Sequence, residues 1–193
     1  MDLHNIAPKL YCPSVANIKF STLAFQGIVN YCFDIDNTLA SRTDEHPLPK
    51  LAAAIERARK AGYIRDLCVV SNIIFGEARR QRVINFARDL NTPHYYAANF
   101  WERKPSPKPF LAAMKMMNSD PTNTAIVGDQ LFTDIIGGNR LGMYTILVQP
   151  IGPDHWCTRL TGRRKKEQIF LQRLGLSDFR DPNDFNEDNK REI

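Results

Sequence analysis

Short apolar runs alternate with segments of helical periodicity along most of the chain. Runs of strand length occur at residues 28–33, 67–70, 95–97, 125–127 and 145–148. Between them, the segments 49–61, 77–90 and 107–117 repeat apolar side chains at intervals of three and four, which is typical of helices that pack on a sheet. The alternation predicts an α/β fold with a mainly parallel, five-stranded sheet and crossover helices on it.

The two ends of the chain carry weaker patterns. The first 26 residues are mixed in polarity, and they indicate a short helix near residues 18–23 that packs against an edge of the sheet. Residues 176–193 are polar and acidic with few apolar side chains. Such a segment cannot bury enough apolar surface to order itself, so we expect a polar tail after one folded domain at residues 1–175.

Composition narrows the class of protein. Of the 193 residues, 43% are hydrophobic, which is too many for a disordered chain and enough for one domain with its own core. No apolar run approaches the roughly 18 residues of a membrane span. Residues 1–15 lack the charged start and apolar stretch of a secretory signal, so we expect a cytoplasmic protein. The four cysteines stand far apart, which indicates neither a disulfide framework nor a zinc site.

The positive charge is concentrated near the C-terminus. The formal net charge is +5, and residues 159–173 hold six basic side chains against one acidic side chain. Two interpretations of this segment stay open: peripheral contact with an anionic membrane, or a solvated helix whose apolar side packs on the body. No recognised nucleic-acid-binding module accompanies the segment, so we expect no nucleic-acid partner.

Acidic residues follow the first and fourth predicted strands. Asp34 and Asp36 stand two apart, so an extended chain directs both carboxylates to the same side. Asp129 and Asp134 follow the fourth strand. We expect the four carboxylates to meet, because the carboxyl ends of parallel strands lie at one edge of the sheet, where α/β proteins bind ligands. Carboxylates this close need a cation, and Mg²⁺ prefers carboxylate and phosphate oxygens.

The second and third predicted strands end in groups that suit a phosphate. Ser71 and Asn72 supply a hydroxyl and loop amides. Lys104 lies just before a helix opened by Pro107, whose amino end attracts anions, and Lys108 in that helix is an alternative to Lys104. An aspartate nucleophile, Mg²⁺ and a phosphate-binding lysine together indicate phosphoryl transfer through an aspartyl-phosphate intermediate.

These motifs resemble those of the haloacid dehalogenase (HAD) superfamily of phosphatases. The four motifs of that superfamily are matched in order by DIDNT at 34–38, SN at 71–72, KP at 104–105 and GDQLFTD at 128–134. The longer run GDQLFTDIIGGNRLGM at 128–143 is similar to the YqeG-like subgroup of class III enzymes. The resemblance implies a Rossmann-like HAD fold, phosphomonoester hydrolysis and bound Mg²⁺.

The resemblance also implies roles for the acidic residues. Asp34 would be the nucleophile, and Asp36 the general acid and base that also offers its backbone carbonyl to the metal. Asp129 would be the direct carboxylate ligand of Mg²⁺. Asp134 would act from farther out, through a water molecule or by orienting Lys104. The expected metal set is therefore Asp34, Asp36, Asp129 and Asp134.

The substrate phosphate is expected to bind Ser71, Asn72 and Lys104 in an open site. Only 32 residues separate Thr38 from Ser71, and 31 separate Asn72 from Lys104. A loop, a helix and a strand use up each interval, which leaves nothing like the ~50 residues of a cap domain. We therefore expect a fold without a cap.

An uncapped site suits a phosphate that is carried by a bulky molecule. The resemblance extends to enzymes that dephosphorylate phosphatidylglycerophosphate, so this lipid is the leading substrate. The DNTL form at residues 36–39 is typical of the bacterial branch, for which lipid activity does not follow automatically. Two alternatives stay open: a HAD phosphatase for another bulky or small phosphorylated substrate, and a non-catalytic regulatory module that binds phosphate.

Overall fold

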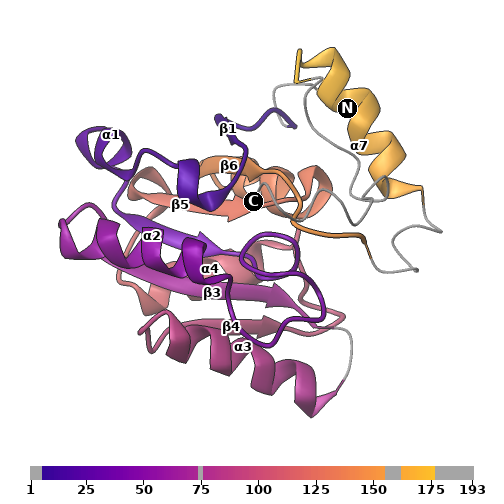
Figure 1. The fold of residues 1–193 in the computed structure, drawn as a ribbon. Coiled ribbons are helices and arrows are strands. Elements are labelled where there is room, and N and C mark those ends of the chain that lie inside the picture. The colour runs from indigo at the N-terminus through magenta and orange to yellow at the C-terminus, as the bar shows by residue number, and fades with distance from the viewer. Residues whose placement is uncertain (1–5, 74–75, 155–161, 177–193) are drawn as a thin grey trace.

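A parallel β-sheet forms the centre of the molecule. A computed structural model describes residues 6–73, 76–154 and 162–176, and the sheet within them has six strands in the order β1-β6-β5-β2-β3-β4 (Figure 1). The strands are β1 Leu10–Cys12, β2 Asn30–Phe33, β3 Asp66–Asn72, β4 Tyr95–Ala98, β5 Thr124–Gly128 and β6 Tyr144–Val148. Every pair of neighbours is parallel, so the predicted α/β class is confirmed.

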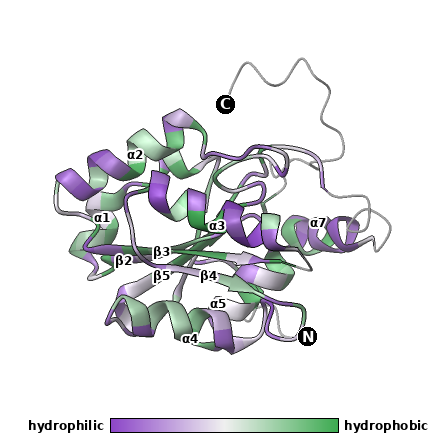
Figure 2. Ribbon diagram, turned by 90° about the horizontal axis from the view of Figure 1, so that it is seen from below, coloured by the Kyte–Doolittle hydropathy of each residue, from purple (hydrophilic) through white to green (hydrophobic). Residues whose placement is uncertain are grey.

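Helices cover both faces of the sheet, as parallel crossover connections require. Figure 2 shows α2 and α3 on one face and α4 and α5 on the other. The helices are α1 Phe20–Phe25, α2 Pro49–Lys60, α3 Glu77–Asp89, α4 Pro107–Met116, α5 Ile136–Arg140 and α7 Arg163–Arg173. A π-helical turn, η4 at Leu131–Ile135, leads directly into α5.

The central strand β2 is buried on both faces. Tyr31 and Phe33 pack into the core under α2 and α3, and their rings stack with centroids 5.9 Å apart. Cys32, between them, points into the core beneath α4, beside Phe110. Because both faces of β2 are packed, the strand has little freedom to move, and the residue that follows it, Asp34, is held at a defined place on the carboxyl edge.

The N-terminal segment differs from the sequence-based expectation. The strand β1 pairs with the edge of β6, and it raises the number of strands from the five predicted to six. Three residues are too few to show an alternating pattern, which is why the sequence did not indicate it. The short helix expected near residues 18–23 begins at Phe20 and ends at Phe25.

The helix α5 was not predicted, because two of its residues are glycines, which are poor helix formers. Their lack of a side chain is what lets the helix approach its neighbours. A Cβ on Gly137 would lie 2.4 Å from the ring of Phe110, and one on Gly138 would lie 2.4 Å from the Ile126 side chain. The close approach positions η4 beside the end of β5, next to Asp129.

The helix α7 lies at the side of the molecule toward which the strands point (Figure 1). It packs on the body through Leu171, which joins a core cluster with Leu131 and Ile135 of η4. One side of α7 therefore packs on the body, as the second interpretation of residues 159–173 expects, and its other side stays exposed. The first part of that segment, 159–161, and the predicted tail from residue 177 onward lie outside the described residues.

No cap domain interrupts the described chain between the motifs. The interval from Thr38 to Ser71 is filled by a loop, α2 and most of β3, and the interval from Asn72 to Lys104 contains α3 and β4. The fold without a cap is therefore as predicted. Among the residues that the structure describes, no helix is both long enough and apolar enough to cross a bilayer.

Candidate active site

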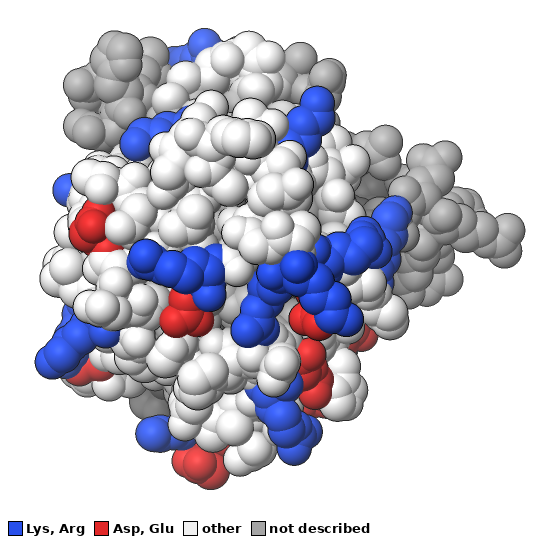
Figure 3. Space-filling view, turned by 90° about the vertical axis from the view of Figure 1, so that its left-hand side faces the viewer, with Lys and Arg blue, Asp and Glu red and all other residues white. Residues whose placement is uncertain are grey.

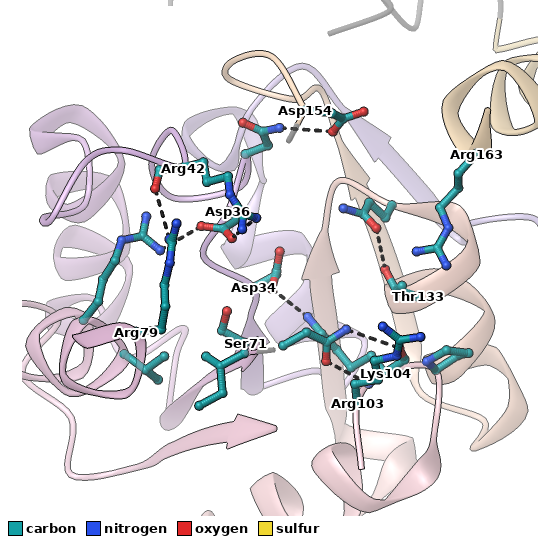
Figure 4. Close-up of a pocket in the computed structure, with 17 residues that line it drawn as sticks. Asp34, Asp36, Arg42, Ser71, Arg79, Arg103, Lys104, Thr133, Asp154 and Arg163 are labelled. Carbon is teal, nitrogen blue, oxygen red and sulfur yellow. Dashed lines mark hydrogen bonds and ion pairs between the residues drawn. The ribbon is translucent and has the colours of Figure 1, made fainter. Parts of the chain in front are cut away.

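A pocket opens at the carboxyl ends of β2, β3 and β5. Asp34 lies near its centre, and Ser71, Lys104 and Thr133 border it from three other segments (Figure 4). Ser71 and Asp34 are buried at its floor. The structure thus brings residues that are 70 positions apart in the sequence, such as Asp34 and Lys104, into contact at the expected edge of the sheet.

Lys104 lies between two carboxylates inside the pocket. Its Nζ is 2.7 Å from Asp34 Oδ1 and 2.6 Å from Asp134 Oδ1, and it also donates to the carbonyl oxygen of Val70 at 3.0 Å. Only 2% of the Lys104 side chain is exposed. The alternative, Lys108, lies on the outside of α4 and pairs with Glu102. Lys104 is therefore the lysine that reaches the pocket.

Asn72 holds the loop that carries Lys104. Its Oδ1 accepts from the backbone N–H of Lys104 at 2.8 Å, and its Nδ2 donates to the Lys104 carbonyl oxygen at 3.2 Å. Both ends of the Asn72 amide are thus engaged with one residue. The side chain therefore positions Lys104, and Asn72 also lines the pocket in which the phosphate is expected to bind.

Three buried carboxylates form a cluster that suits a divalent cation. Asp34, Asp129 and Asp134 each offer an oxygen within 4.8 Å of the others. Oδ1 of Asp129 is buried, with no hydrogen-bond partner in the described structure, and a hard cation would satisfy it. Gly128 leaves the room for this cluster, because a Cβ there would lie 2.3 Å from Cγ of Asp134. The residues present therefore fit the expected metal.

Burial and mutual repulsion shift the pKa values of the groups in this cluster. Burial raises the pKa of Asp34 to about 7, Lys104 opposes this shift, and the charges of Asp134 and Asp36 add to it. Burial likewise holds the pKa of Asp129 well above its ordinary value, against the influence of Arg164. Burial alone would lower the pKa of Lys104, but the two carboxylates raise it, so the lysine stays charged. A bound cation would relieve the repulsion among the carboxylates.

Adding Mg²⁺ is therefore expected to stabilise the protein. A ligand present at 100 times its dissociation constant contributes about 2.7 kcal/mol, which corresponds to a thermal midpoint about 5 °C or more higher in a chain of this size. Calorimetry with and without Mg²⁺ measures the shift. Asp129→Asn should lose most of it, whereas Glu45→Gln, an exposed change outside the pocket, should keep it. Equal shifts in all three proteins would place the ion elsewhere.

The carboxylate of Asp36 is turned away from this cluster. Its Oδ1 accepts from Nη1 of Arg82 at 2.7 Å, and its Oδ2 lies 3.4 Å from Nη1 of Arg42. Arg82 is 3% exposed and also donates to the carbonyl oxygens of Asp44 and Ser41, at 2.7 and 2.9 Å. Arg82 thus ties the loop after β2 to α3 and orients Asp36 at the pocket.

Sequence reasoning missed Arg82. A signal was present, since Arg82 stands one helical turn before Phe86 on the apolar side of α3, and its guanidinium lies 4.8 Å from the centre of that ring. An arginine within a buried stripe needs an acidic or carbonyl partner, because an unpaired charge is costly to bury. A buried Arg82 therefore indicates an acidic or carbonyl partner, and the structure identifies that partner as Asp36.

Arg164 was missed as well, because it stands in a basic run that favours a solvated surface. It is 3% exposed and contacts three acids: Asp129 at Oδ2, Asp154 at 2.9 Å and Glu167 at 3.0 Å. The signal is the spacing of Arg164, Glu167 and Leu171, which are the buried residues of α7 and lie three and four positions apart. The charge of Arg164 is thus committed to the pocket and is not available to a membrane.

Comparisons with known proteins agree on one family. Residues 101–150 match the model of the HAD-hydrolase-like family. The chain is 31% identical to the probable phosphatase YqeG of Bacillus subtilis over 86% of this chain and 90% of that protein. It is 27% identical to phosphatidylglycerophosphate phosphatase 1 of Arabidopsis thaliana, over 78% of this chain and 42% of that protein. A HAD phosphatase from Thermococcus onnurineus shares the fold at 13% identity, with a TM-score of 0.50 over 70% of this chain and 99% of its own.

Proposed function

The chain belongs to the YqeG-like phosphatases of the HAD superfamily and is a phosphomonoester hydrolase. We propose that the enzyme depends on Mg²⁺ and uses Asp34 as its nucleophile. We also propose phosphatidylglycerophosphate as its leading substrate. The observation that carries the mechanism is the position of Asp34, which lies at the pocket floor with Lys104 on one side and Asp36 nearby. A phosphoryl group above Asp34 would meet all three side chains.

In the first half of the reaction, a carboxylate oxygen of Asp34 attacks the phosphorus atom of the substrate. The bond from phosphorus to the leaving oxygen breaks, and Asp36 gives that oxygen a proton. In the second half, Asp36 takes a proton from water, and the resulting hydroxide attacks the aspartyl-phosphate. Phosphate leaves and Asp34 is regenerated. Arg82 keeps Asp36 oriented for both proton transfers.

The phosphoryl oxygens need several positive or donor groups. The hydroxyl of Ser71 and the loop amides at 71–73 offer hydrogen bonds, and the ammonium group of Lys104 neutralises charge. Held by Asp34, Asp129 and, less directly, Asp134, Mg²⁺ would supply further positive charge to the phosphoryl group. Since Lys104 already pairs with Asp34, it also keeps the nucleophile and the phosphate from repelling each other.

The lipid assignment is supported by the likeness to the Arabidopsis enzyme and by the absence of a cap in the described chain. We expect kcat/KM for phosphatidylglycerophosphate in mixed micelles to exceed that for soluble sugar and nucleotide phosphates at least tenfold. A lower or equal kcat/KM for the lipid would contradict the lipid assignment and favour another phosphorylated substrate. If no monoester, including an aryl phosphate, is hydrolysed with Mg²⁺ present, the chain is a non-catalytic phosphate-binding module.

Peripheral membrane contact through the segment 159–173 is part of the same proposal. On α7, the exposed side carries Lys165 and Lys166, and Ile169 is half exposed. Sedimentation with anionic vesicles tests the contact. Replacing Lys165 and Lys166 by Gln should weaken binding, and Arg164 must be left intact because it is buried against the pocket.

A further inference from the structure

Three arginines that line the pocket form no direct ion pair with a carboxylate among the described residues, although the charge of one of them, Arg163, acts on Glu167. They are Arg79 on α3, Arg103 on the loop before α4, and Arg163 at the start of α7. Each of the other basic side chains at the site is paired with carboxylates: Arg42, Arg82, Lys104 and Arg164. Positive charge is therefore left over at the mouth of the pocket.

Two of these arginines are oriented without being neutralised. Nη1 of Arg79 donates to the backbone carbonyl of Arg42 at 3.2 Å. The guanidinium of Arg103 lies 4.5 Å from the centre of the Phe100 ring. Neither a carbonyl nor an aromatic ring cancels a full charge, so both arginines keep their capacity to bind an anion.

Basic side chains are more numerous than acidic ones in the walls of the pocket. Figure 3 shows the face at the amino ends of the strands, opposite the pocket, where acidic and basic side chains both occur. At the pocket, six basic side chains and three acidic ones line the walls, and Asp129 and Asp134 lie in the buried cluster with Asp34. Arginines flank Asp34 on both sides in Figure 4, with Arg42 and Arg79 on one side and Arg103 and Arg163 on the other.

The phosphate that is cleaved does not account for these arginines. Its oxygens already have Ser71, the loop amides, Lys104 and the metal as partners. Arg79 instead lies next to Arg42, which contacts Asp36, the residue that protonates the leaving oxygen. The leaving group must pass Asp36 to receive its proton, so Arg79 borders the path of the leaving group.

We propose that the pocket binds a second anionic group, carried by the leaving group of the phosphomonoester, and that Arg79 is its principal partner, with Arg103 and Arg163 adding positive charge at the mouth. The substrate class is a phosphomonoester whose alcohol portion bears a further phosphate, phosphodiester or carboxylate. The planar guanidinium suits such groups because it donates two parallel hydrogen bonds. The inference rests on the proposed phosphatase function and narrows its substrate.

Paired substrates test this inference in a soluble arm and a lipid arm. Phosphoglycolate, whose leaving group is an alcohol that bears a carboxylate, is compared with ethyl phosphate, and phosphatidylglycerophosphate is compared with phosphatidic acid in the same mixed micelles. A charge-assisted hydrogen bond contributes about 1.5–3 kcal/mol, so kcat/KM should be at least about tenfold higher for the member of each pair with the second anion, mainly through KM. If only the soluble pair shows the preference for the second anion, the natural substrate is a soluble phosphomonoester. If only the lipid pair shows it, the natural substrate is a lipid.

Arg79→Gln should bring the ratio within each pair close to one. Arg80→Gln is the matched control, since Arg80 is the next residue of α3, is exposed and does not line the pocket, and it should keep the wild-type ratio. A wild-type ratio near one in both arms, or an unchanged ratio in Arg79→Gln, overturns the inference.

A binding measurement separates this inference from the phosphatase proposal. Isothermal titration with phosphoglycolate and with ethyl phosphate needs no turnover. If no substrate is hydrolysed, the proposed function fails, yet tighter binding of phosphoglycolate that is lost in Arg79→Gln still supports the second-anion site. Equal binding of the two ligands to the wild-type protein overturns the site even if hydrolysis is fast.

Discussion

Asp34→Asn is expected to lower phosphate release from an aryl phosphate, with Mg²⁺ present, by at least about a thousandfold, because loss of a covalent nucleophile removes the step on which the others depend. The amide has nearly the shape of the carboxylate but is far too weak a nucleophile to attack phosphorus. Lys104 keeps its other partner, Asp134, at 2.6 Å, so the pocket should stay assembled. The measurement is the steady-state rate of phosphate release.

Glu45→Gln is the control for this change. It also replaces a carboxylate by an amide, in the same loop after β2, but Glu45 is exposed and does not line the pocket. Its rate should match that of the wild-type protein, and circular dichroism should show both variants folded. If Asp34→Asn retained more than a tenth of the wild-type rate, another group would have to be the nucleophile.

Arg164→Met is expected to lower the free energy of unfolding by about 3–5 kcal/mol, which is the usual cost of removing one partner from a buried ion pair. Methionine keeps much of the side-chain volume, so the loss comes mainly from the charge. The change would leave Asp129, Asp154 and Glu167 without their shared cation. Urea denaturation followed by circular dichroism measures the difference.

The pH dependence of the stability lost in Arg164→Met shows whether the loss comes from the missing charge or from altered packing. Burial already raises the pKa values of Asp129 and Glu167, and Arg164 opposes both shifts. Without Arg164 these pKa values rise further above the unfolded values, so the folded variant binds more protons than its unfolded form and loses stability as pH rises. The deficit relative to wild type should therefore be larger at about pH 8 than at about pH 5. A deficit that does not change with pH would indicate packing alone.

Lys165→Met serves as the neighbouring control. Lys165 belongs to the same basic run but is exposed on α7, so its replacement should change the free energy of unfolding by no more than about 0.5 kcal/mol. Similar losses in the two variants would mean that α7 does not hold Arg164 in the buried position described.

The places of the motif residues follow from local patterns. Asp34 and Asp129 come directly after buried strands, and Ser71 lies near the end of another. Parallel strands connected by helices end at the same edge of a sheet. The prediction of this edge, of the α/β class and of a fold without a cap therefore needed only hydrophobic periodicity and the lengths between motifs. The short strand β1 and the glycine-containing helix α5 were not predicted, because neither has a local pattern that distinguishes it.

By itself, the sequence determined the order of the strands along the chain, the chemistry that each one delivers and the family. The tertiary structure decided which charges pair. Lys104 rather than Lys108 meets Asp34, Arg82 reaches Asp36 across 46 residues, and Arg164 reaches Asp129 across 35. Periodicity reports the neighbours of a residue within its own element, whereas an ion pair depends on distances between elements. Those distances are set by packing, and packing separates a buried arginine from the exposed lysines beside it in the same basic run.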